Sequence, residues 1–587
     1  MTGESTATAV VKPSRRGFLR ASVGGVLLAS AALPLLDACT PGAPAASGSS
    51  ASATGTAGGA QPNTSAAGPL PTFVPFAQPG LKPDFRFDDP RYDDGYDNYP
   101  QQRLKAVAEA PGTGGTIDVL ITNYIQPPMP YEQNSTWQYI NKQLNAQIRM
   151  NIVASPDYRA KFATVMAGDD LPDIMHIYYG YSLAPNLPAF LKAKCEDLTP
   201  YLAGDAIKDY PYLAALPTYA WKNSTAAIDG QLFLVPIQRH LPTFPGNGGY
   251  FFAQTEAWNK EIGPGYVPKD GDDFKRVLLA LTHPQEGQWG FGYSPGGGAA
   301  NTVGPFGVAV FAAQLFGGPN IWRLDTGGKL LRDWETDEYK AATGYVRDLM
   351  AAGVFPPDVT TIAQSRPQHA DGKYAVAIDG YGNSMADLWR RGQPERHFFM
   401  LPFFAAESGI HSNALLSKGY ISLNALKKAQ PERIKELLRV MNYLASPFGS
   451  EEDLLLSYGI KDQDYSLDGR GNPVPNQEGL ARSAFVPWQY IARRPHVNYQ
   501  ADLPGFAKAS YDAQQVIMPI GVEDPTNGYY APTQFSKGLT ADIAINDGLI
   551  DIILNRRPFS DYDSLLADWR SAAGDQVRKE YLQAMSA

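Results

Sequence analysis

Residues 155–181 read S-P-D-Y-R-A-K-F-A-T-V-M-A-G-D-D-L-P-D-I-M-H-I-Y-Y-G-Y, which predicts a helix, a polar turn and a short buried strand. Apolar side chains recur in the first part at the three- and four-residue spacing of one helix face: Tyr158, Phe162, Val165 and Met166. The helix is expected to stop at residues 168–170, because Pro172 cannot continue it. Residues 174–177 then form an apolar run followed by aromatic residues and glycine, as a strand that ends in a loop does.

The end of this strand is a candidate place for ligand contact. In α/β sheets, ligands tend to bind beyond the carboxyl ends of the strands. Tyr178, Tyr179 and Tyr181 stand at that position. An equally good interpretation is that these tyrosines only cover the edge of the sheet.

The same stretch resembles the family 1 extracellular solute-binding proteins of ABC importers, in which a D-Y-x-x-K-F helix precedes G-D-x-P-D-I and a strand. Further similar segments follow in that family's order: D-G-Q-L-F-L-V-P at 229–236, G-Q-W-G-F-G at 287–292 and K-Y-A-V-A-I-D-G-Y-G at 373–382. No single motif is specific, but their order over residues 116–587 is. The resemblance implies a lipoprotein that binds a sugar or an oligosaccharide for an importer.

The resemblance also implies a fold, namely the α/β, two-lobed, periplasmic-binding-protein-like (type II) fold. Each lobe is expected to be a mixed sheet flanked by helices, with hinge strands between the lobes near Pro236, residues 374–379 and residues 418–422. The alternation of strands and helices over residues 116–178 agrees with this, because β-α-β-α-β implies a parallel sheet. We expect residues 116–236 plus 360–410 in the first lobe, and residues 237–359 plus 411–587 in the second.

The N-terminal residues indicate export. Residues 14–20, S-R-R-G-F-L-R, form a twin-arginine pattern, and the apolar run after them is too short for a membrane span and typical of a signal peptide. Residues 36–39, L-D-A-C, resemble a lipobox, which implies a signal peptide of residues 1–38 and a lipid on Cys39. Asp37 is unusual in such a box, so plain secretion is the alternative. We expect a lipid anchor on the extracytoplasmic face of the cell membrane.

Residues 39–115 are expected to form a tether and a leader. Residues 40–70 are almost all Ala, Gly, Ser, Thr and Pro, and such a segment buries too little surface to offset the entropy of ordering it. Residues 71–115 are rich in Pro, Asp and Tyr and are predicted to lie irregularly on the folded body. Residues 101–110 are the one expected helix of this leader.

Composition narrows the classes of function. The net charge of −9 argues against nucleic-acid binding and against a polybasic membrane patch. The two cysteines, Cys39 and Cys195, exclude a disulfide framework. The folded part of about 500 residues exceeds what one hydrophobic core holds, so at least two lobes are expected.

The sequence offers no local motif for catalysis. It contains no H-E-x-x-H, no phosphate-binding loop and no G-x-S-x-G, and its seven histidines show no metal-ligand spacing. Some members of the family carry a calcium loop before G-x-W-G-F, but residues 282–285 here, T-H-P-Q, are too few and too poor in oxygen ligands. We therefore predict no enzyme activity, no metal and no cofactor, although a glycosidase pair of carboxylates meeting in space stays open.

Sugar recognition needs flat rings against C–H faces and rigid polar groups around the hydroxyls. Candidates are residues after strands or near the hinge: Tyr124, Tyr179, Arg239, His240, Tyr250, Trp289, Asp379, Tyr381 and Trp488. Other interpretations stay open for three of them. Arg239 could bridge the lobes, Trp289 could be a core residue, and Asp379 could cap a turn.

The expected function is capture of a sugar or oligosaccharide by hinge closure, followed by delivery to the membrane subunits of an ABC permease. The expected partners are this ligand, the permease and, through Cys39, the lipid bilayer; the protein is expected to be a monomer. The alternatives are a peptide receptor of the same fold, a surface glycan-active hydrolase and a structural adhesion protein.

Overall fold

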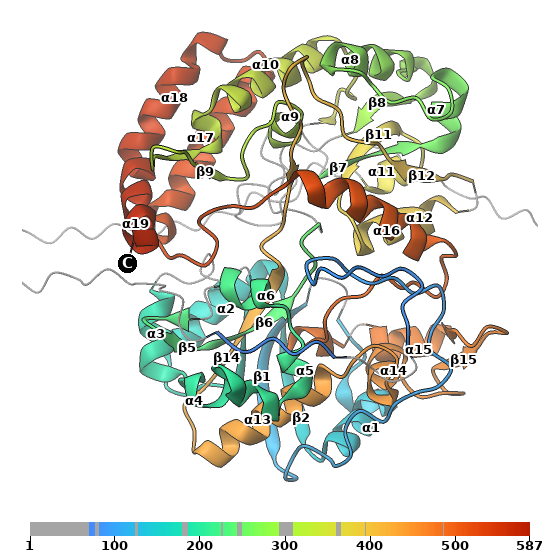
Figure 1. Cartoon of the computed structure of the whole chain (residues 1–587), viewed down its shortest axis with the longest axis vertical. Coiled ribbons are helices and arrows are strands. Elements are labelled where there is room, and N and C mark those ends of the chain that lie inside the picture. The colour runs from blue at the N-terminus through green and yellow to red at the C-terminus, as the bar shows by residue number, and fades with distance from the viewer. Residues whose placement is uncertain are drawn as a thin grey trace, which may run out of the picture. The chain divides into compact units, whose positions relative to one another are not determined.

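The structure is a computed structural model of the chain. It describes residues 70–76, 81–123, 127–178, 186–224, 227–242, 249–292, 309–359, 366–393, 395–484 and 486–586. Two sheets with separate hydrophobic cores organise these residues (Figure 1). No helix in the described ranges combines the length and the apolar composition that a bilayer-spanning segment needs.

The first sheet has five strands. Their order across the sheet is β2 (Gln147–Ala154), β1 (Thr116–Asn123), β3 (Ile174–Tyr178), β14 (Tyr420–Leu426) and β6 (Leu234–Gln238). β1 pairs in parallel with β2 and β3, whereas β14 runs antiparallel to both β3 and β6. The carboxyl ends of β1, β2, β3 and β6 therefore share one edge of the sheet.

The stretch that predicted the fold forms the expected elements. α2 (Ser155–Ala167) precedes β3, and its two fully buried side chains are Tyr158 and Phe162. The Tyr158 hydroxyl donates to the main-chain carbonyl of His176, which fixes the helix to the strand. α1 (Ser135–Leu144) and α13 (Pro431–Leu444) contribute to the same core. The predicted helix, turn and strand are thus confirmed.

The second sheet has four strands, in the order β12 (Phe398–Met400), β7 (Tyr250–Gln254), β11 (Tyr374–Asp379) and β8 (Trp289–Gly292). β11 pairs in parallel with β8 and antiparallel with β7. A Cβ on Gly292 would lie 1.9 Å from the ring of Tyr374, so only glycine fits there.

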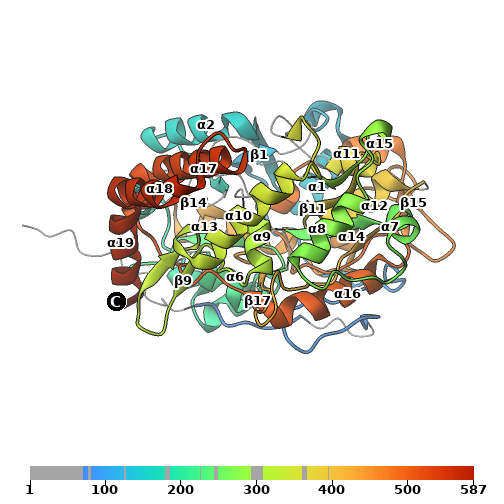
Figure 2. The ribbon, with the colours of Figure 1, turned by 90° about the horizontal axis from the view of Figure 1, so that it is seen from above.

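Helices from two distant parts of the chain cover the second sheet. The middle of the chain gives α7 (Thr255–Glu261), α8 (Gly271–Ala280), α9 (Val310–Leu315), α10 (Asp337–Ala351) and α12 (Asn383–Gly392). The C-terminal part gives α16 (Phe506–Ile517), α17 (Leu539–Ile553), α18 (Tyr562–Trp569) and α19 (Asp575–Ser586). Figure 2 shows α17, α18 and α19 gathered at one end, where α17 packs on α10.

The sheet pairing corrects the expected lobe boundaries. Residues 374–379 were expected in the first lobe and as a hinge strand, but they form an inner strand of the second sheet. Residues 420–426 were expected in the second lobe, but they lie inside the first sheet as β14. Strand partners are set by tertiary packing, which the local pattern of a strand does not encode. The chain crosses between the sheets after Gln238, as predicted, and again between Met400 and Tyr420.

The leader is irregular, as predicted, and it lies on both lobes. Phe87 stacks on Tyr92 and contacts Tyr511 of α16, while Tyr99 packs edge-on to Phe448 near the first core. The helix expected at residues 101–110 is absent from these described residues. The main-chain N–H groups of residues 106 and 107 instead donate to the carboxylate of Glu452, which holds the leader extended.

Candidate ligand-binding site

The carboxyl edges of the two sheets are joined by two crossings of the chain, and the first of them follows β6. β6 ends at Gln238 at the same edge as Asn123 and Tyr178, the last residues of β1 and β3. The crossing then delivers the chain to β7, whose first residue, Tyr250, pairs with Asp379 at the end of β11. Ligands of α/β proteins bind at this kind of edge, so the topology places the site around the crossing. Tyr124 and Tyr179, and with them Tyr181, lie outside the described residues.

Arg239 and His240 lie in the first crossing, and their main chains form hydrogen bonds with residues of the second crossing. The Arg239 main-chain N–H donates to the carbonyl of Gly419 over 2.9 Å, and Ser417 Oγ donates to the carbonyl of His240 over 2.9 Å. The Arg239 side chain is partly exposed, whereas His240 is buried. Burial lowers the pKa of His240, against the opposing effect of the nearby Asp93 carboxylate. His240 therefore belongs to the interior of the hinge.

Asp379 is held by an arginine that sequence reasoning missed. Arg366 donates to both Asp379 carboxylate oxygens, with Nε and Nη2 each 2.6 Å away, and reaches Asp387 over 3.2 Å. The Gly380 N–H also donates to Asp379 over 2.7 Å, which is the turn cap considered as an alternative role. Burial lowers the pKa of Arg366, but the hydrogen bonds and negative charges of Asp379 and Asp387 have the larger effect, so the pKa lies above its ordinary value. Asp379 therefore already has partners at both oxygens.

Tyr250 and Tyr381 pack inside the second lobe. Both side chains are fully buried, with exposed fractions of 2% and 0%. The Tyr381 hydroxyl donates to the carbonyl of Ser510 over 2.9 Å, and its ring meets the His240 ring edge-on at 5.1 Å. Tyr381 thus packs against His240 of the first crossing, and the contact of both tyrosines with a ligand stays a prediction.

Trp289 lies at the opposite edge of the second sheet. It pairs with Tyr374 at the start of β11, five residues before Asp379 at the carboxyl end. Its ring is partly exposed and lies 5.7 Å from the Lys373 ammonium group. Because β8 and β11 run in parallel, the structure does not bring Trp289 together with the other candidates.

Trp488 is a core residue of the first lobe. Its side chain is 4% exposed and meets Trp137 of α1 edge-on, with ring centres 5.9 Å apart. The same Trp137 stands in the first turn of α1, where its N–H donates to the capping side chain of Asn134. Trp488 therefore packs in the first core, and its contact with a ligand stays a prediction.

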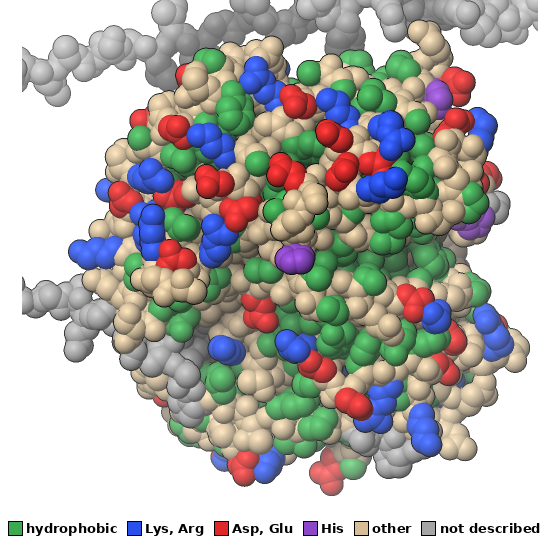
Figure 3. All heavy atoms as spheres, turned by 45° about the horizontal axis from the view of Figure 1, so that its top comes forward, with side chains coloured by type: hydrophobic (Ala, Val, Ile, Leu, Met, Phe, Trp, Pro, Cys, Tyr) green, Lys and Arg blue, Asp and Glu red, His purple; other side chains and the backbone are tan. Residues whose placement is uncertain are grey.

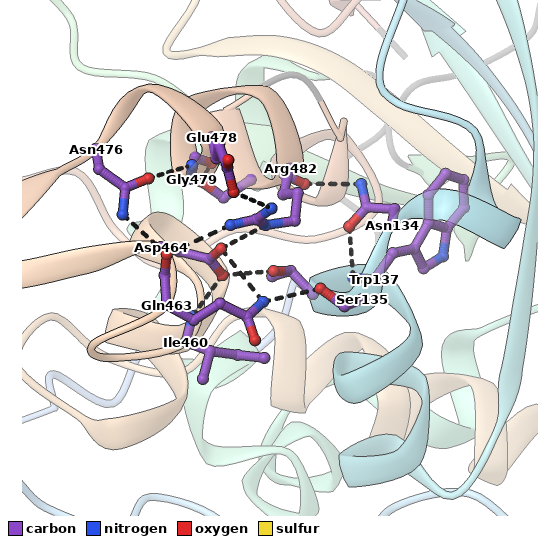
Figure 4. A network of polar contacts seen from close by, with 12 residues as sticks. Asn134, Ser135, Trp137, Ile460, Gln463, Asp464, Asn476, Glu478, Gly479 and Arg482 are labelled. Atoms are coloured by element: carbon purple, nitrogen blue, oxygen red, sulfur yellow. Dashed lines mark hydrogen bonds and ion pairs between the residues drawn. The ribbon is translucent and has the colours of Figure 1, made fainter.

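A polar network around Asp464 fixes that region (Figure 4). Asp464 is buried and accepts from Arg482 Nε at 2.6 Å, from the Ile460 N–H at 2.8 Å and from the Thr136 hydroxyl. Burial raises its pKa, but these hydrogen bonds outweigh that effect and hold the pKa below its ordinary value. Asn134 Nδ2 in turn donates to the carbonyl of Arg482, so α1 and residues 460–484 form one rigid unit.

Two arginines make the crossing region positive. Arg239 and Arg493 interact as like charges, and Arg493 has no carboxylate within ion-pair distance in the described part of the chain. Burial and the neighbouring guanidinium groups of Arg494 and Arg239 lower the pKa of Arg493 to about 10. Sequence reasoning missed Arg493, because nothing local distinguishes the A-R-R-P segment from a surface loop.

One face of the molecule is hollowed. Figure 3 shows hydrophobic side chains gathered in the hollowed middle of one face, with charged side chains spread around it. Mostly apolar concave surfaces with a few polar groups are typical of small-molecule sites.

The comparisons with known proteins agree with this topology. No protein-family model matches the chain. A curated relative, the polygalacturonan/rhamnogalacturonan-binding protein YtcQ of Bacillus subtilis, is 23% identical over 394 residues, which are 65% of this chain and 75% of that protein.

Among solved structures, the S. pneumoniae ABC-transporter substrate-binding protein FusA in complex with kestose aligns with a TM-score of 0.57 and 17% identity, over 80% of this chain and 99% of that one. The extracellular solute-binding protein from Bifidobacterium longum subsp. infantis aligns with a TM-score of 0.60 and 14% identity, over 80% and 98%. The chain has the solute-binding-protein fold. The predicted two-lobed α/β class and the resemblance seen in the ordered motifs are confirmed.

Proposed function

We propose that this protein is the extracellular solute-binding component of an ABC importer, and that it captures a sugar or oligosaccharide between its lobes and delivers it to a membrane permease. The observation that carries this is the pair of chain crossings that join the carboxyl edges of the two sheets. Such crossings act as a hinge, because few residues absorb the motion of two rigid bodies. A ligand that contacts both lobes favours the closed form by its differential affinity.

The charges near the crossing favour a ligand with carboxylate groups. Arg239 and Arg493 are partly exposed, and Arg493 has no ion-pair partner among the described residues. A guanidinium group in this position gains by binding a carboxylate in a bidentate pair. The curated relative is named for polygalacturonan, a polymer of acidic sugar units. We infer that acidic oligosaccharides bind more tightly than neutral ones.

The membrane location is part of the same proposal. The twin-arginine pattern and the lipobox-like residues 36–39 support export and a lipid on Cys39. A Cys39→Ser variant is expected to leave the membrane fraction and appear in the medium. Retention of that variant in the membrane would refute the anchor without affecting the receptor proposal.

A binding screen tests the function. The mature protein is melted alone and with oligogalacturonides, neutral oligosaccharides of the same length, or short peptides. A ligand that binds only the folded protein raises its stability by about 2.7 kcal/mol at a hundredfold excess over its dissociation constant. We expect oligogalacturonides to raise the melting temperature and to be recovered unchanged. Consumption of the sugar would indicate an enzyme, and a response to peptides alone would indicate a peptide receptor.

An arginine variant tests the preference for acidic sugars. Arg493→Gln is expected to weaken oligogalacturonide binding at least tenfold, about 1.4 kcal/mol, and to leave neutral-sugar binding within twofold. Arg557→Gln, a change at an arginine outside the crossings, serves as the matched control. Equal affinity of both variants for the acidic ligand would overturn the assignment of Arg493.

A further inference from the structure

Three side chains from three distant segments converge beside the hinge. Asp93 comes from the leader, His240 from the β6–β7 crossing, and His496 from the segment that precedes α16. His240 Nδ1 lies 2.6 Å from Asp93 Oδ2 and 2.9 Å from His496 Nδ1. His496 Nδ1 lies 3.5 Å from the same Asp93 oxygen. One carboxylate oxygen and two imidazole nitrogens therefore face a common point.

The three groups are buried together. The side chains of Asp93, His240 and His496 are 5%, 2% and 8% exposed. Within the described residues, Asp93 Oδ2 accepts no hydrogen bond of acceptable geometry, although two ring nitrogens lie close to it. A buried carboxylate needs a positive or donating partner, which the two imidazoles or a bound cation can supply. The arrangement suits atoms that direct their lone pairs at one ion.

The surrounding residues hold the three groups in place. Gln514 brackets Asp93, since its Oε1 accepts from the Asp93 N–H at 2.7 Å and its Nε2 donates to the Asp93 carbonyl at 3.0 Å. The His496 N–H donates to Gln238 Oε1 at 3.0 Å. Gly382 approaches the His240 ring so closely that a Cβ there would lie 2.6 Å from its Cε1. Metal sites depend on such outer contacts to orient their ligands.

We propose that Asp93, His240 and His496 bind one divalent transition-metal ion of the zinc class and so tie the leader to the hinge. Ligand atoms about 2.0–2.2 Å from one tetrahedral ion lie about 3.3–3.6 Å apart. The separation of 3.5 Å matches this range, and the separations of 2.6 and 2.9 Å have to widen when the ion binds. Two nitrogens and one carboxylate oxygen suit Zn²⁺, whereas Ca²⁺ and Mg²⁺ prefer oxygen ligands alone. This differs from the expectation of no metal drawn from the sequence.

The protonation states agree with coordination. The neighbouring histidines hold the pKa of Asp93 at about 2 against the effect of its burial, so its carboxylate is ionised. Burial lowers the pKa of His496 to about 3, which keeps its ring in the neutral form that binds metals. Arg239 and Arg493 also lower the pKa of His240, and their positive charges oppose any cation. The site therefore favours an ion held by coordinate bonds from nitrogen over one held by charge alone.

The experiment uses the mature chain after chelation and dialysis. We expect Zn²⁺ to bind with a stoichiometry of one and to raise the melting temperature. Co²⁺ is expected to give the visible absorption of a tetrahedral site with nitrogen ligands. His496→Gln and Asp93→Asn are expected to weaken Zn²⁺ binding at least a hundredfold, while His411→Gln, at an exposed histidine, leaves it unchanged.

Each result decides the question. Circular dichroism identifies a variant that does not fold, and the other variant then carries the test. Absence of stoichiometric Zn²⁺ binding by the wild-type chain would overturn the proposal. So would equal Zn²⁺ affinity of the folded site variants and the wild-type chain, or an equal loss in His411→Gln. The trio would then be a hydrogen-bonded joint without a metal.

Discussion

Asp379→Asn is predicted to destabilise the second lobe through its pair with Arg366. The carboxylate accepts two hydrogen bonds of 2.6 Å from the guanidinium group and one of 2.7 Å from the Gly380 N–H. The asparagine keeps the shape but removes the charge and turns one acceptor into a donor that faces another donor.

The magnitude follows from burial. Loss of one partner from a fully buried ion pair costs about 3–5 kcal/mol, and a hydrogen bond to a charged group contributes about 1.5–3 kcal/mol. The Asp379 side chain is 7% exposed, but the Arg366 side chain is 30% exposed and water can solvate it after the change. We therefore expect a loss of about 2–3 kcal/mol.

Asp387→Asn is the matched control, because Asp387 contacts the same arginine. Its contact with Arg366 is longer, 3.2 Å, and its side chain is 38% exposed. Exposed ion pairs contribute about 0–1 kcal/mol, so this variant should stay close to the wild type. The free energy of unfolding is measured from urea denaturation followed by circular dichroism. A loss below about 0.5 kcal/mol for Asp379→Asn, or equal losses in both variants, would refute the reasoning.

Three further predictions concern single positions. Gly382→Ala should lower the stability clearly more than Gly353→Ala. Both glycines have a positive φ, which costs an alanine about 1–2 kcal/mol, but only Gly382→Ala adds a clash with His240. Equal melting temperatures of the two variants would contradict this. The pKa of Asp464 is lower in the folded protein than its ordinary value of 3.8. The stability that this carboxylate adds is therefore complete at a pH above 3.8 and is lost as the pH falls through the lower pKa of the folded protein. Asp464→Asn should flatten this acid dependence, and an unchanged profile would exclude the role. Burial raises the pKa of the Cys195 thiol to about 12, so thiol reagents should label it only in denaturant; rapid labelling of the folded chain would contradict its burial.

Local patterns predicted the elements of this fold. The spacing of Tyr158 and Phe162 identified α2. The partners of β11 and β14 could not be predicted, because strand pairing depends on the assembled core. The helix expected in residues 101–110 does not form, because main-chain N–H groups of this segment donate to the distant Glu452.

The candidate site shows the same limit. Arg239 and His240 were found because they follow a recognisable strand, β6. Arg366, the ion-pair partner of Asp379, lies before β11, and no local sequence motif marks it. The three proposed metal ligands are separated by 147 (240 − 93) and 256 (496 − 240) residues, so no spacing rule connects them.

The insertion of β14 between β3 and β6 also constrains how the polypeptide folds. The second sheet uses residues 250–400, one continuous stretch of chain, and can form as soon as that stretch exists. The first sheet cannot be completed until β14, which ends at residue 426, pairs with β3 and β6, and all strands of the second sheet precede β14 in the chain. Contacts between such distant residues slow folding, because a long loop closes before they form. The first sheet is therefore expected to be completed after the second sheet.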